Sequence, residues 1–370
     1  MKNILDYGII PDGKNDFSAY IETALKEYKN VYFPNGKYLI SKPISMPSNS
    51  KIKADKNAEI IAKDNCFNYD CCYGVVTNED LINGNENIEI DGGIFNGNNI
   101  NNARKNWRNG PCTGLLFNFM NVKGLTLKNI LAKNSESYHF RIGKTENFLI
   151  ENIEIFDDYL TMCQDGIHVG GGSHNGVIKN VFANKGNPND DLIAFNADDT
   201  NTYCQNFGMQ DLPISNMLVD GVYAEDCWTA VRILSVHNAV ENITLKNFKV
   251  GVRELGINFD AGRYSEDPQF KDGEYPNGVG YMKNITFENF TLWRTRERDL
   301  PVNVLEQNGD NIVYKNFTRD LDKDKSPNQP FMRFKFLKTS NFTVNDNKFI
   351  LENGNEYIYN EKSLNEIIMN

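Results

Sequence analysis

A short, degenerate repeat recurs along most of this 370-residue chain and constrains its fold more than any other feature. Each copy has a polar or Asn/Gly turn, a short strand of alternating apolar residues, a second Asn/Gly corner and another short strand. The copies read ENIEIDGGIF, KGLTLKNILA, ENFLIENIEI, HNGVIKNVFA, ISNMLVDGVYA, VENITLKNFKV, MKNITFENFTL, DNIVYKNFTR and SNFTVNDNKF, beginning at Glu86, Lys123, Glu146, His174, Ile214, Val240, Met282, Asp310 and Ser340. Successive copies begin 23 to 42 residues apart, which is a spacing typical of solenoids.

Strands of about five residues between Asn/Gly corners predict an all-β fold, a single-stranded, right-handed parallel β-helix in which each coil contacts only its neighbours. Asn suits such corners because it tolerates left-handed backbone angles and bonds its own main chain. A β-sandwich, the alternative, would place hairpin turns between longer strands. Asn-x-Thr sequons such as those at Asn242, Asn284, Asn289 and Asn341 fall on the same corners and are therefore interpreted as turns rather than glycosylation sites.

The open ends of a solenoid expose unpaired strand edges that must be covered. The segment DFSAYIETALKEYK carries Ile21, Leu25 and Tyr28 on one helical face, with Asp16 as the expected N-cap. We therefore predict one domain over residues 1–370. It has an N-terminal capping helix within about residues 1–30, coils over about 31–349 and a weak C-terminal cap over about 350–370.

The charge balance argues against nucleic acid as a partner. The net charge is −10, whereas binding to phosphates needs a basic stripe. An anionic sugar remains compatible, because a local basic pocket can exist on an acidic protein. The seven cysteines are odd in number and show no paired CxxC spacing, so neither a disulfide framework nor a zinc site is predicted.

No apolar run approaches the roughly 20 residues that cross a bilayer, so we expect no membrane partner. The N-terminus, MKNILDYGII, lacks the apolar region and cleavage site of a signal peptide. The sequence as written therefore predicts a cytoplasmic protein, or a secreted one if a signal peptide had been removed. It predicts no oligomeric state.

Acidic residues recur at a spacing of about one coil. His139, Asp165 and Asp190 are separated by 26 and 25 residues, so we expect them to lie above one another on three adjacent coils. Asp191 accompanies Asp190, and Arg232 follows one longer coil later. Because stacked carboxylates repel one another and destabilise a fold, we interpret this group as a functional site rather than as solvated turn residues.

The surrounding motifs resemble those of the polygalacturonases, glycoside hydrolase family 28. CQDGIHV resembles the family's NTDG motif, NDDLIAF its GDD-containing motif and VRIL its RIK motif, beginning at Cys163, Asn189 and Val231. The run NSESYHFRIGKTENFLIENIEI is similar to the one before the family's catalytic coil. DYGIIPDGKNDFSAYIETAL followed by VYFPNGKYLI resembles the start of the wider pectate-lyase-like β-helix superfamily. The resemblance covers about the first two thirds of the chain.

This resemblance implies hydrolysis of a glycosidic bond with inversion and without a metal or other cofactor. Asp190 would protonate the leaving oxygen, while Asp165 and Asp191 would activate the attacking water. Such a division requires one carboxyl group to stay protonated while the others are ionised. An inverting pair also needs about 6.5–9.5 Å between its carboxyl groups, a spacing that we expect adjacent coils to supply.

Three differences from the family's pattern bear on the substrate. No GHG motif occurs between Asp191 and Arg232, Leu234 replaces the lysine of RIK, and Gln164 replaces the threonine of NTDG. The missing lysine would have paired with the carboxylate of a uronic acid. These differences argue against polygalacturonate more than against cleavage of a glycan.

Further residues near these motifs are predicted to bind the substrate. His168 would bind a sugar or transfer a proton, or would instead face solvent from a strand; both interpretations stay open. Asp198 and Asp199 are expected to line the cleft rather than to cap a corner. Trp228 is expected to stack on a sugar ring. The predicted substrate-binding residues are His139, His168, Asp198, Asp199, Trp228 and Arg232.

Two other classes of function compete with hydrolysis. One is a β-helix polysaccharide lyase or an epimerase, and in a lyase the acidic residues would hold Ca²⁺ through oxygen ligands. The other is a β-helix that binds glycans without catalysis. A lyase releases an unsaturated product that absorbs in the ultraviolet and loses activity with chelators. A hydrolase shows neither effect, and a binding protein releases no product.

Overall fold

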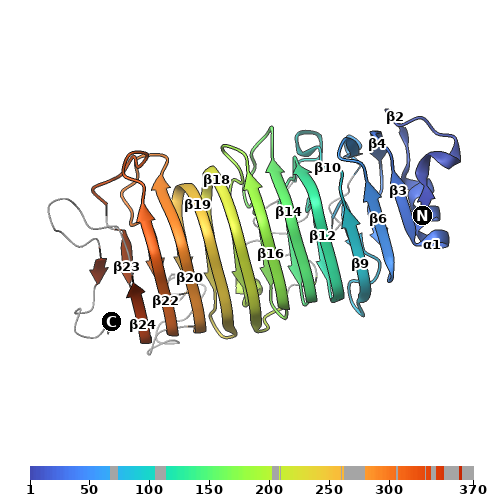
Figure 1. The fold of residues 1–370 in the computed structure, drawn as a ribbon. Coiled ribbons are helices and arrows are strands. Elements are labelled where there is room, and N and C mark those ends of the chain that lie inside the picture. The colour runs from blue at the N-terminus through green and yellow to red at the C-terminus, as the bar shows by residue number, and fades with distance from the viewer. Residues whose placement is uncertain are drawn as a thin grey trace.

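The computed structural model describes residues 1–66, 74–104, 114–201, 208, 210–259, 261, 280–305, 307–329, 331–334, 339–345 and 358–360. Within them the chain forms a right-handed parallel β-helix, as predicted. Figure 1 shows its coils stacked in chain order, with β3 near one end of the stack and β24 near the other. Each coil has three faces, which we call the first, second and third in the order in which the chain reaches them.

The short strands each belong to one face. The first face contains β1 (Lys2–Asn3), β3 (Asn30–Phe33), β6 (Ser50–Ala54), β9 (Asn85–Asp91) and β24 (Thr339–Asn345). The second contains β2 (Asp12–Asp16), β4 (Gly36–Ile40), β7 (Ala58–Ala62) and β10 (Ile94–Asn96). The third contains β5 (Ile44–Met46), β8 (Val76–Asn78), β11 (Phe117–Met120), β13 (Phe140–Gly143), β15 (Ile167–Gly170), β17 (Asp191–Asn196), β21 (Asn303–Leu305), β23 (Met332–Phe334) and β25 (Ile358–Asn360).

Longer strands bend around a corner and serve more than one face. They are β12 (Val122–Lys133), β14 (Glu146–Phe156), β16 (His174–Ala183), β18 (Ile214–Leu234), β19 (Ala239–Phe259), β20 (Tyr281–Arg294) and β22 (Gly309–Arg319). β18 and β19 pair along all three faces, with a register irregularity between Ala224 and Thr229. The remaining elements are the helix α1 (Ser18–Tyr28) and the 3₁₀ turns η1 (Ile4–Tyr7), η2 (Asn99–Asn101) and η3 (Asp199–Asn201).

One asparagine per coil makes most of the corners between the first and second faces. We call this row the asparagine corner; its members are Asn129, Asn152, Asn180, Asn247, Asn289 and Asn316, all with φ between 52° and 61°. Each side-chain amide can donate to the previous coil, as Asn152 does to Asn129 (2.9 Å) and Asn289 to Asn247 (3.0 Å). A second row lies near the start of the first-face strands and includes the sequon residues Asn242 and Asn284. The interpretation of sequons as turns therefore fits these two residues and Asn289.

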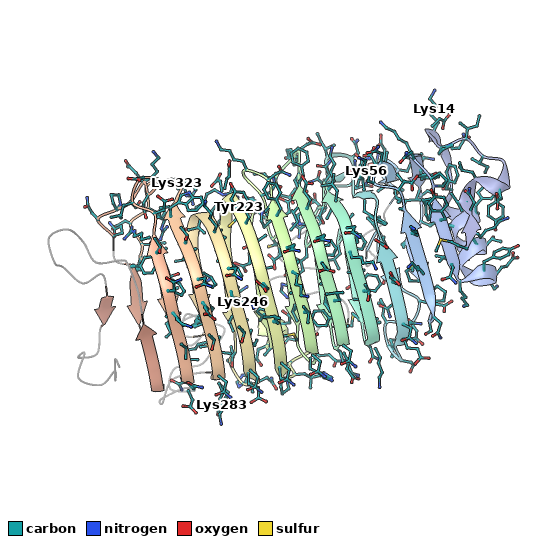
Figure 2. All side chains as sticks on the ribbon, viewed as in Figure 1. Lys14, Lys56, Tyr223, Lys246, Lys283 and Lys323 are labelled. Atoms are coloured by element: carbon teal, nitrogen blue, oxygen red, sulfur yellow. The ribbon has the colours of Figure 1, made fainter. Side chains whose placement is uncertain are left out.

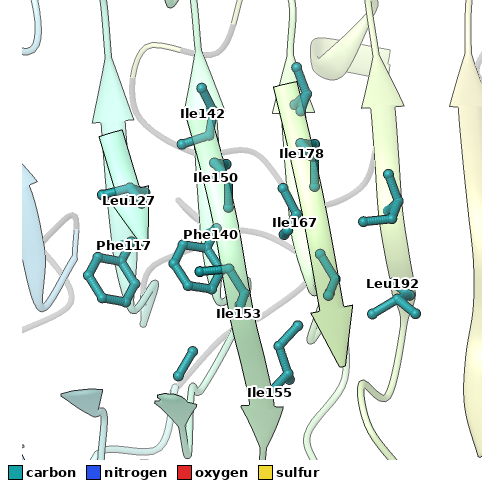
Figure 3. Packing of buried hydrophobic residues seen from close by; sticks show 14 of the residues in the cluster. Phe117, Leu127, Phe140, Ile142, Ile150, Ile153, Ile155, Ile167, Ile178 and Leu192 are labelled. Carbon is teal, nitrogen blue, oxygen red and sulfur yellow. The ribbon is translucent and has the colours of Figure 1, made fainter. Parts of the chain in front are cut away.

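The core is a continuous column of inward-facing apolar side chains (Figure 3). Alternation along each strand sends every second side chain inward. Like residues stack on one another between coils: the rings of Phe117 and Phe140 lie parallel at 4.7 Å, and those of Phe248 and Phe290 at 4.3 Å. The outward-facing side chains are largely polar (Figure 2) and form pairs between coils, such as Lys246 with Asp220 at 3.2 Å.

The N-terminal end differs in detail from the expected cap. Helix α1 buries Ile21 and Leu25 as predicted, but Tyr28 is half exposed. Asp16 accepts a hydrogen bond from the backbone N–H of Ser18 (2.9 Å). Residues 1–30 also contribute strands, since β1 and β2 pair in parallel with β3 and β4. The helix is therefore inserted between strands that already belong to the coils.

Most of the predicted C-terminal cap, residues 350–370, lies outside the described residues. Within it, β25 continues the third face by pairing in parallel with β23. In the described part of the chain no helix is long and apolar enough to cross a membrane. The described cysteines Cys66, Cys163 and Cys227 are free thiols.

Candidate active site

The three candidate catalytic aspartates lie where two loops lead into the third face. Asp165 lies near the end of the loop between β14 and β15, Asp190 ends the loop between β16 and β17, and Asp191 is the first residue of β17. One carboxylate oxygen of each residue lies within 4.8 Å of the other two. Asp165 and Asp191 are buried, whereas Asp190 is partly exposed. We call these three residues the acidic cluster.

The strand register differs by one residue from the alignment predicted for His139, Asp165 and Asp190. Phe140 pairs with Ile167, which pairs with Ile193; two residues earlier, Asp165 therefore aligns with Asp191. The coils are 27 and 26 residues long here (167 − 140 and 193 − 167), one residue longer than the spacing that aligned His139, Asp165 and Asp190. That alignment is wrong. Asp190 instead reaches the cluster from the turn just before the strand.

His168 is a buried support for Asp165. Its Nδ1 lies 2.6 Å from Oδ2 of Asp165 and its Nε2 lies 2.8 Å from Oδ1 of Asp199. Because both ring nitrogens face carboxylates, both must carry protons, and the ring is an imidazolium. The ring also stacks on Tyr138, with centroids 4.4 Å apart.

Electrostatics agree with this protonation state. Burial by itself lowers the pKa of His168, but the charge of Asp199 and the hydrogen bond to Asp165 outweigh it and raise the pKa to about 10. The side chain has no exposed surface. The interpretation that His168 faces solvent from a strand is wrong, because the side chain is buried and holds Asp165. A role in sugar binding or proton transfer stays a prediction.

His139 supports the same loop from the other side. Its backbone N–H and its Nδ1 each lie 2.8 Å from the carbonyl oxygen of Asp165. Its Nε2 lies 3.0 Å from Oδ2 of Asp157. Burial opposes the charged form, yet Asp157 raises the pKa of His139. His139 is fully buried, so the prediction that it binds substrate is wrong and its position fits a structural support of Asp165.

The second acidic pair is also buried beneath the surface. Oδ2 of Asp198 accepts hydrogen bonds from three consecutive backbone N–H groups, those of Val236, His237 and Asn238. Asp198 thus caps a turn, and the expectation that it lines the cleft is wrong. Asp199, equally buried, binds His168 and contacts no open surface.

Arg232 and Trp228 lie beside the acidic cluster on the next coil. Nη1 of Arg232 is 3.8 Å from Oδ2 of Asp191, which places its charge at the cluster as expected. The ring of Trp228 is already in contact with cations: the guanidinium of Arg296 lies 4.7 Å from the ring centroid and that of Arg253 lies 5.5 Å away. The ring therefore already has cation partners, and its predicted stacking on a sugar stays a prediction.

Sequence reasoning missed several supporting residues. Asp157 and Tyr138 contact the two histidines, and Arg253 binds the loop that ends in Asp190. Gln164, which replaces the family's threonine, is buried and donates to the carbonyl oxygen of Ser135 (2.6 Å). No repeat spacing marks these residues, because they act across loops and coils of different length.

Comparisons with known proteins agree with this architecture. Residues 1–253 match the family described as rhamnogalacturonase A/epimerase, pectate lyase-like. The chain belongs to this family. The matched region contains the whole acidic cluster and Arg232 of this rhamnogalacturonase A/epimerase-like chain.

Individual relatives are distant. The "Probable rhamnogalacturonase E" of Aspergillus flavus is 22% identical over 326 residues, which are 80% of this chain and 65% of the relative. The chain spans less than two thirds of the length of each of three curated relatives that it matches. For two of them the share is 16% and 23%.

Solved structures share the fold at low identity. The surface adhesin PfbA of Streptococcus pneumoniae has a TM-score of 0.58 at 16% identity, covering 94% of this chain and 91% of that one. The family 28 exopolygalacturonase of Yersinia enterocolitica has a TM-score of 0.57 at 13% identity, covering 94% and 78%. Together with the family match, these findings confirm the predicted resemblance to polygalacturonase-like β-helix proteins.

Proposed function

We propose that this chain is a glycoside hydrolase that cleaves a polysaccharide or oligosaccharide at the acidic cluster. One observation carries the proposal: three carboxylates from two adjacent coils converge within 4.8 Å, and two of them are buried. Such convergence is costly to a fold. The family, described by a rhamnogalacturonase and an epimerase, and the relative named as a rhamnogalacturonase support a reaction on a glycan.

Each carboxylate has an environment that suits a different role. Asp190 is the partly exposed member, so its proton can reach the oxygen of a leaving sugar. Asp165 is buried, and the cation of His168 stabilises its negative charge at 2.6 Å. Asp191 is buried beside the guanidinium of Arg232. In this mechanism Asp190 donates the proton, and Asp165 and Asp191 orient a water and accept its proton.

The stereochemical course rests on the family resemblance rather than on distance. One oxygen of each carboxylate lies within 4.8 Å of the others, whereas the roughly 6.5–9.5 Å of an inverting pair is measured between whole carboxyl groups. The two distances join different atoms, so the predicted spacing of the carboxyl groups stays a prediction. The product's anomeric configuration, followed by proton NMR in the first minutes of reaction, tests inversion separately from hydrolysis.

The residues around the acidic cluster bear on the charge of the sugar that it would cleave. Leu234, which stands where the resembling motif has lysine, is fully buried on β18. It offers no charge to a uronic acid at that position. Arg232 places a guanidinium 3.8 Å from Oδ2 of Asp191.

The test is incubation with a panel of plant, bacterial and animal glycans. Wild-type protein and Asp190→Asn are compared, with Asp158→Asn as the matched control, because Asp158 is exposed and pairs with Lys133 away from the cluster. We expect new reducing ends from the wild type and from Asp158→Asn, no absorbance of an unsaturated product and no effect of EDTA. Binding of a glycan without any product would contradict hydrolysis.

A second candidate is a Ca²⁺-dependent lyase or an epimerase, favoured by the same convergence of oxygen ligands. Three carboxylates would supply part of the six to eight oxygens that Ca²⁺ takes, but Arg232 places a positive charge 3.8 Å from one of them. Loss of activity with EDTA, restored by Ca²⁺, together with ultraviolet absorbance or a changed sugar configuration, would favour this candidate over hydrolysis.

A further inference from the structure

Arg253, on β19, reaches back across two coils to the loop that ends in Asp190. Its guanidinium donates three hydrogen bonds there: Nη2 to the carbonyl oxygens of Gly186 and Pro188 (both 2.9 Å), and Nη1 to Oδ1 of Asn189 (3.2 Å). The register runs from Asp191 to Thr229 and from Thr229 to Leu255, so Arg253 lies two coils beyond the residues that it holds.

The loop that Arg253 binds is itself hydrogen-bonded to the loop that leads to Asp165. The amide of Asn189 accepts from Arg253 and donates to the carbonyl oxygen of Thr161 (2.8 Å). Thr161 in turn donates from its backbone N–H to Oε1 of Gln164 (3.2 Å), the residue directly before Asp165. Both loops that build the acidic cluster are thus tied to one guanidinium.

Two neighbours hold the guanidinium itself in place. Its Nε lies 3.7 Å from Oδ1 of Asp226, and its Cζ lies 5.5 Å from the centroid of the Trp228 ring. The backbone N–H of Gly186 donates to the carbonyl oxygen of Asp226, and that of Trp228 to Pro188. A planar fork with several fixed donors can satisfy three acceptors at once, whereas the ammonium of lysine is a single point charge.

We propose that Arg253 is a positioning residue that sets the geometry of the acidic cluster through the loops of Asp190 and Asp165, without touching the reacting atoms. Its effect on catalysis rests on the proposed function, while its effect on the loops does not. A misplacement of about 1 Å in an active site can cost 10²-fold in rate. Loss of the hydrogen bonds that Arg253 donates to the loop is therefore expected to lower the rate strongly.

The test combines a structural and a kinetic measurement on the full chain. Hydrogen–deuterium exchange of Arg253→Ala should be at least tenfold faster in peptides covering residues 184–191 and faster in 157–164, with β12 unchanged. Arg253→Lys should behave similarly, since it keeps the charge but not the fork. Millimolar guanidinium should restore protection to Arg253→Ala, and methylammonium should not. The kcat should fall about 10²-fold with KM within about threefold.

Arg296→Ala is the matched control, because Arg296 also lies against Trp228 but donates to Glu254 and to the carbonyl of Arg253 instead of to the loop. It should leave exchange in 184–191 unchanged. Unchanged exchange in Arg253→Ala would overturn the proposal, as would an equal rise in β12 or in the Arg296→Ala control. If no glycan is cleaved by any variant, the exchange data still decide the role of Arg253, and only the proposed function fails.

Discussion

The asparagine corner and the acidic cluster occupy different corners of the same coils and follow opposite rules. At the asparagine corner one residue type recurs, with the same left-handed φ and the same amide-to-amide hydrogen bond from coil to coil. At the acidic cluster the residue type changes with each coil: Tyr138, Asp165, Asp191 and Thr229 follow one another in register. The first corner faces solvent, whereas the second buries charge.

This difference distinguishes the residues that stabilise the solenoid from the residues of the candidate site. A repeated neutral ladder lowers the free energy of every coil that contains it, so it can extend along the chain. Carboxylates cannot be stacked in this way without repulsion. They occur on two adjacent coils only, and each buried one has its own cation, His168 for Asp165 and Arg232 for Asp191.

The largest expected effect separates roles within the acidic cluster. Asp190→Asn keeps the shape of the side chain but removes the transferable proton, so kcat should fall by about 10²–10⁴-fold. On an activated aryl glycoside, whose leaving group needs little protonation, the loss should be much smaller. Asp165→Asn should slow both substrates, because attack by water is impaired in each. Equal losses for both variants on both substrates would mean that the assigned roles are wrong.

The next effect uses pH to probe the buried cation. The pKa of His168 is raised to about 10 in the folded protein, against about 6.5 when unfolded. Its contribution to stability is therefore complete below pH 6.5, declines above it and is lost as the pH passes 10, a change on the order of a few kcal/mol. Urea unfolding at pH 6, 8 and 10 measures it.

His168→Gln should flatten this dependence, and His174→Gln, which changes a half-exposed histidine, should retain it. A wild-type stability that rises between pH 6.5 and 10 would contradict a protonated His168.

A smaller effect comes from crowding at the support of the acidic cluster. An added Cβ at Gly170 would lie 2.6 Å from Oδ2 of Asp199, while at Gly143, the equivalent position one coil earlier, the nearest atom is 3.6 Å away. Gly170→Ala should lower the free energy of unfolding by about 1–3 kcal/mol. Gly143→Ala should change it little. Similar melting temperatures for the two variants would show that Asp199 is free to move.

A comparable effect belongs to a single step of the asparagine corner. Asn289 donates to Asn247 and accepts from Asn316, with φ of 59°. Asn289→Ala loses both bonds and strains the backbone, for about 2 kcal/mol in total. Asn289→Gly should cost less because it removes the strain; Gly221 already occupies one step of this row, with φ of 82°. Thermal melting of both variants decides the order.

The fold could be predicted because its signal is repeated. Corner residues such as Asn152 and Asn180 recur with alternating apolar strands between them, and each repetition reinforces the others. Coil length is not repeated so regularly. The spacing of 26 and 25 residues between His139, Asp165 and Asp190 therefore brought the right loops together while misaligning the strands by one residue.

The candidate site could be predicted only in part, for a related reason. The motifs that follow one another along the chain also lie on neighbouring coils of the structure. They contribute Asp165, Asp191 and Arg232, which lie close together. Burial and partners are set by tertiary contacts that no motif records. Asp198 resembles a cleft residue until the turn at residues 236–238 is seen to bind it, and Arg253 has no motif at all.

One measurement tests the central claim, that chemistry and fold stability reside at different corners of the same coils. It compares two substitutions, Asp to Asn at the acidic cluster and Asn to Asp at the asparagine corner. For each variant, kcat on the cleaved glycan and the free energy of unfolding in urea are measured. Asp190→Asn should lower kcat by about 10²–10⁴-fold without lowering stability. Asn152→Asp, which turns the donor facing Asn129 into an acceptor, should lower stability by about 1 kcal/mol and leave kcat within about twofold. Near-wild-type turnover by Asp190→Asn, with a loss of stability instead, would contradict the account.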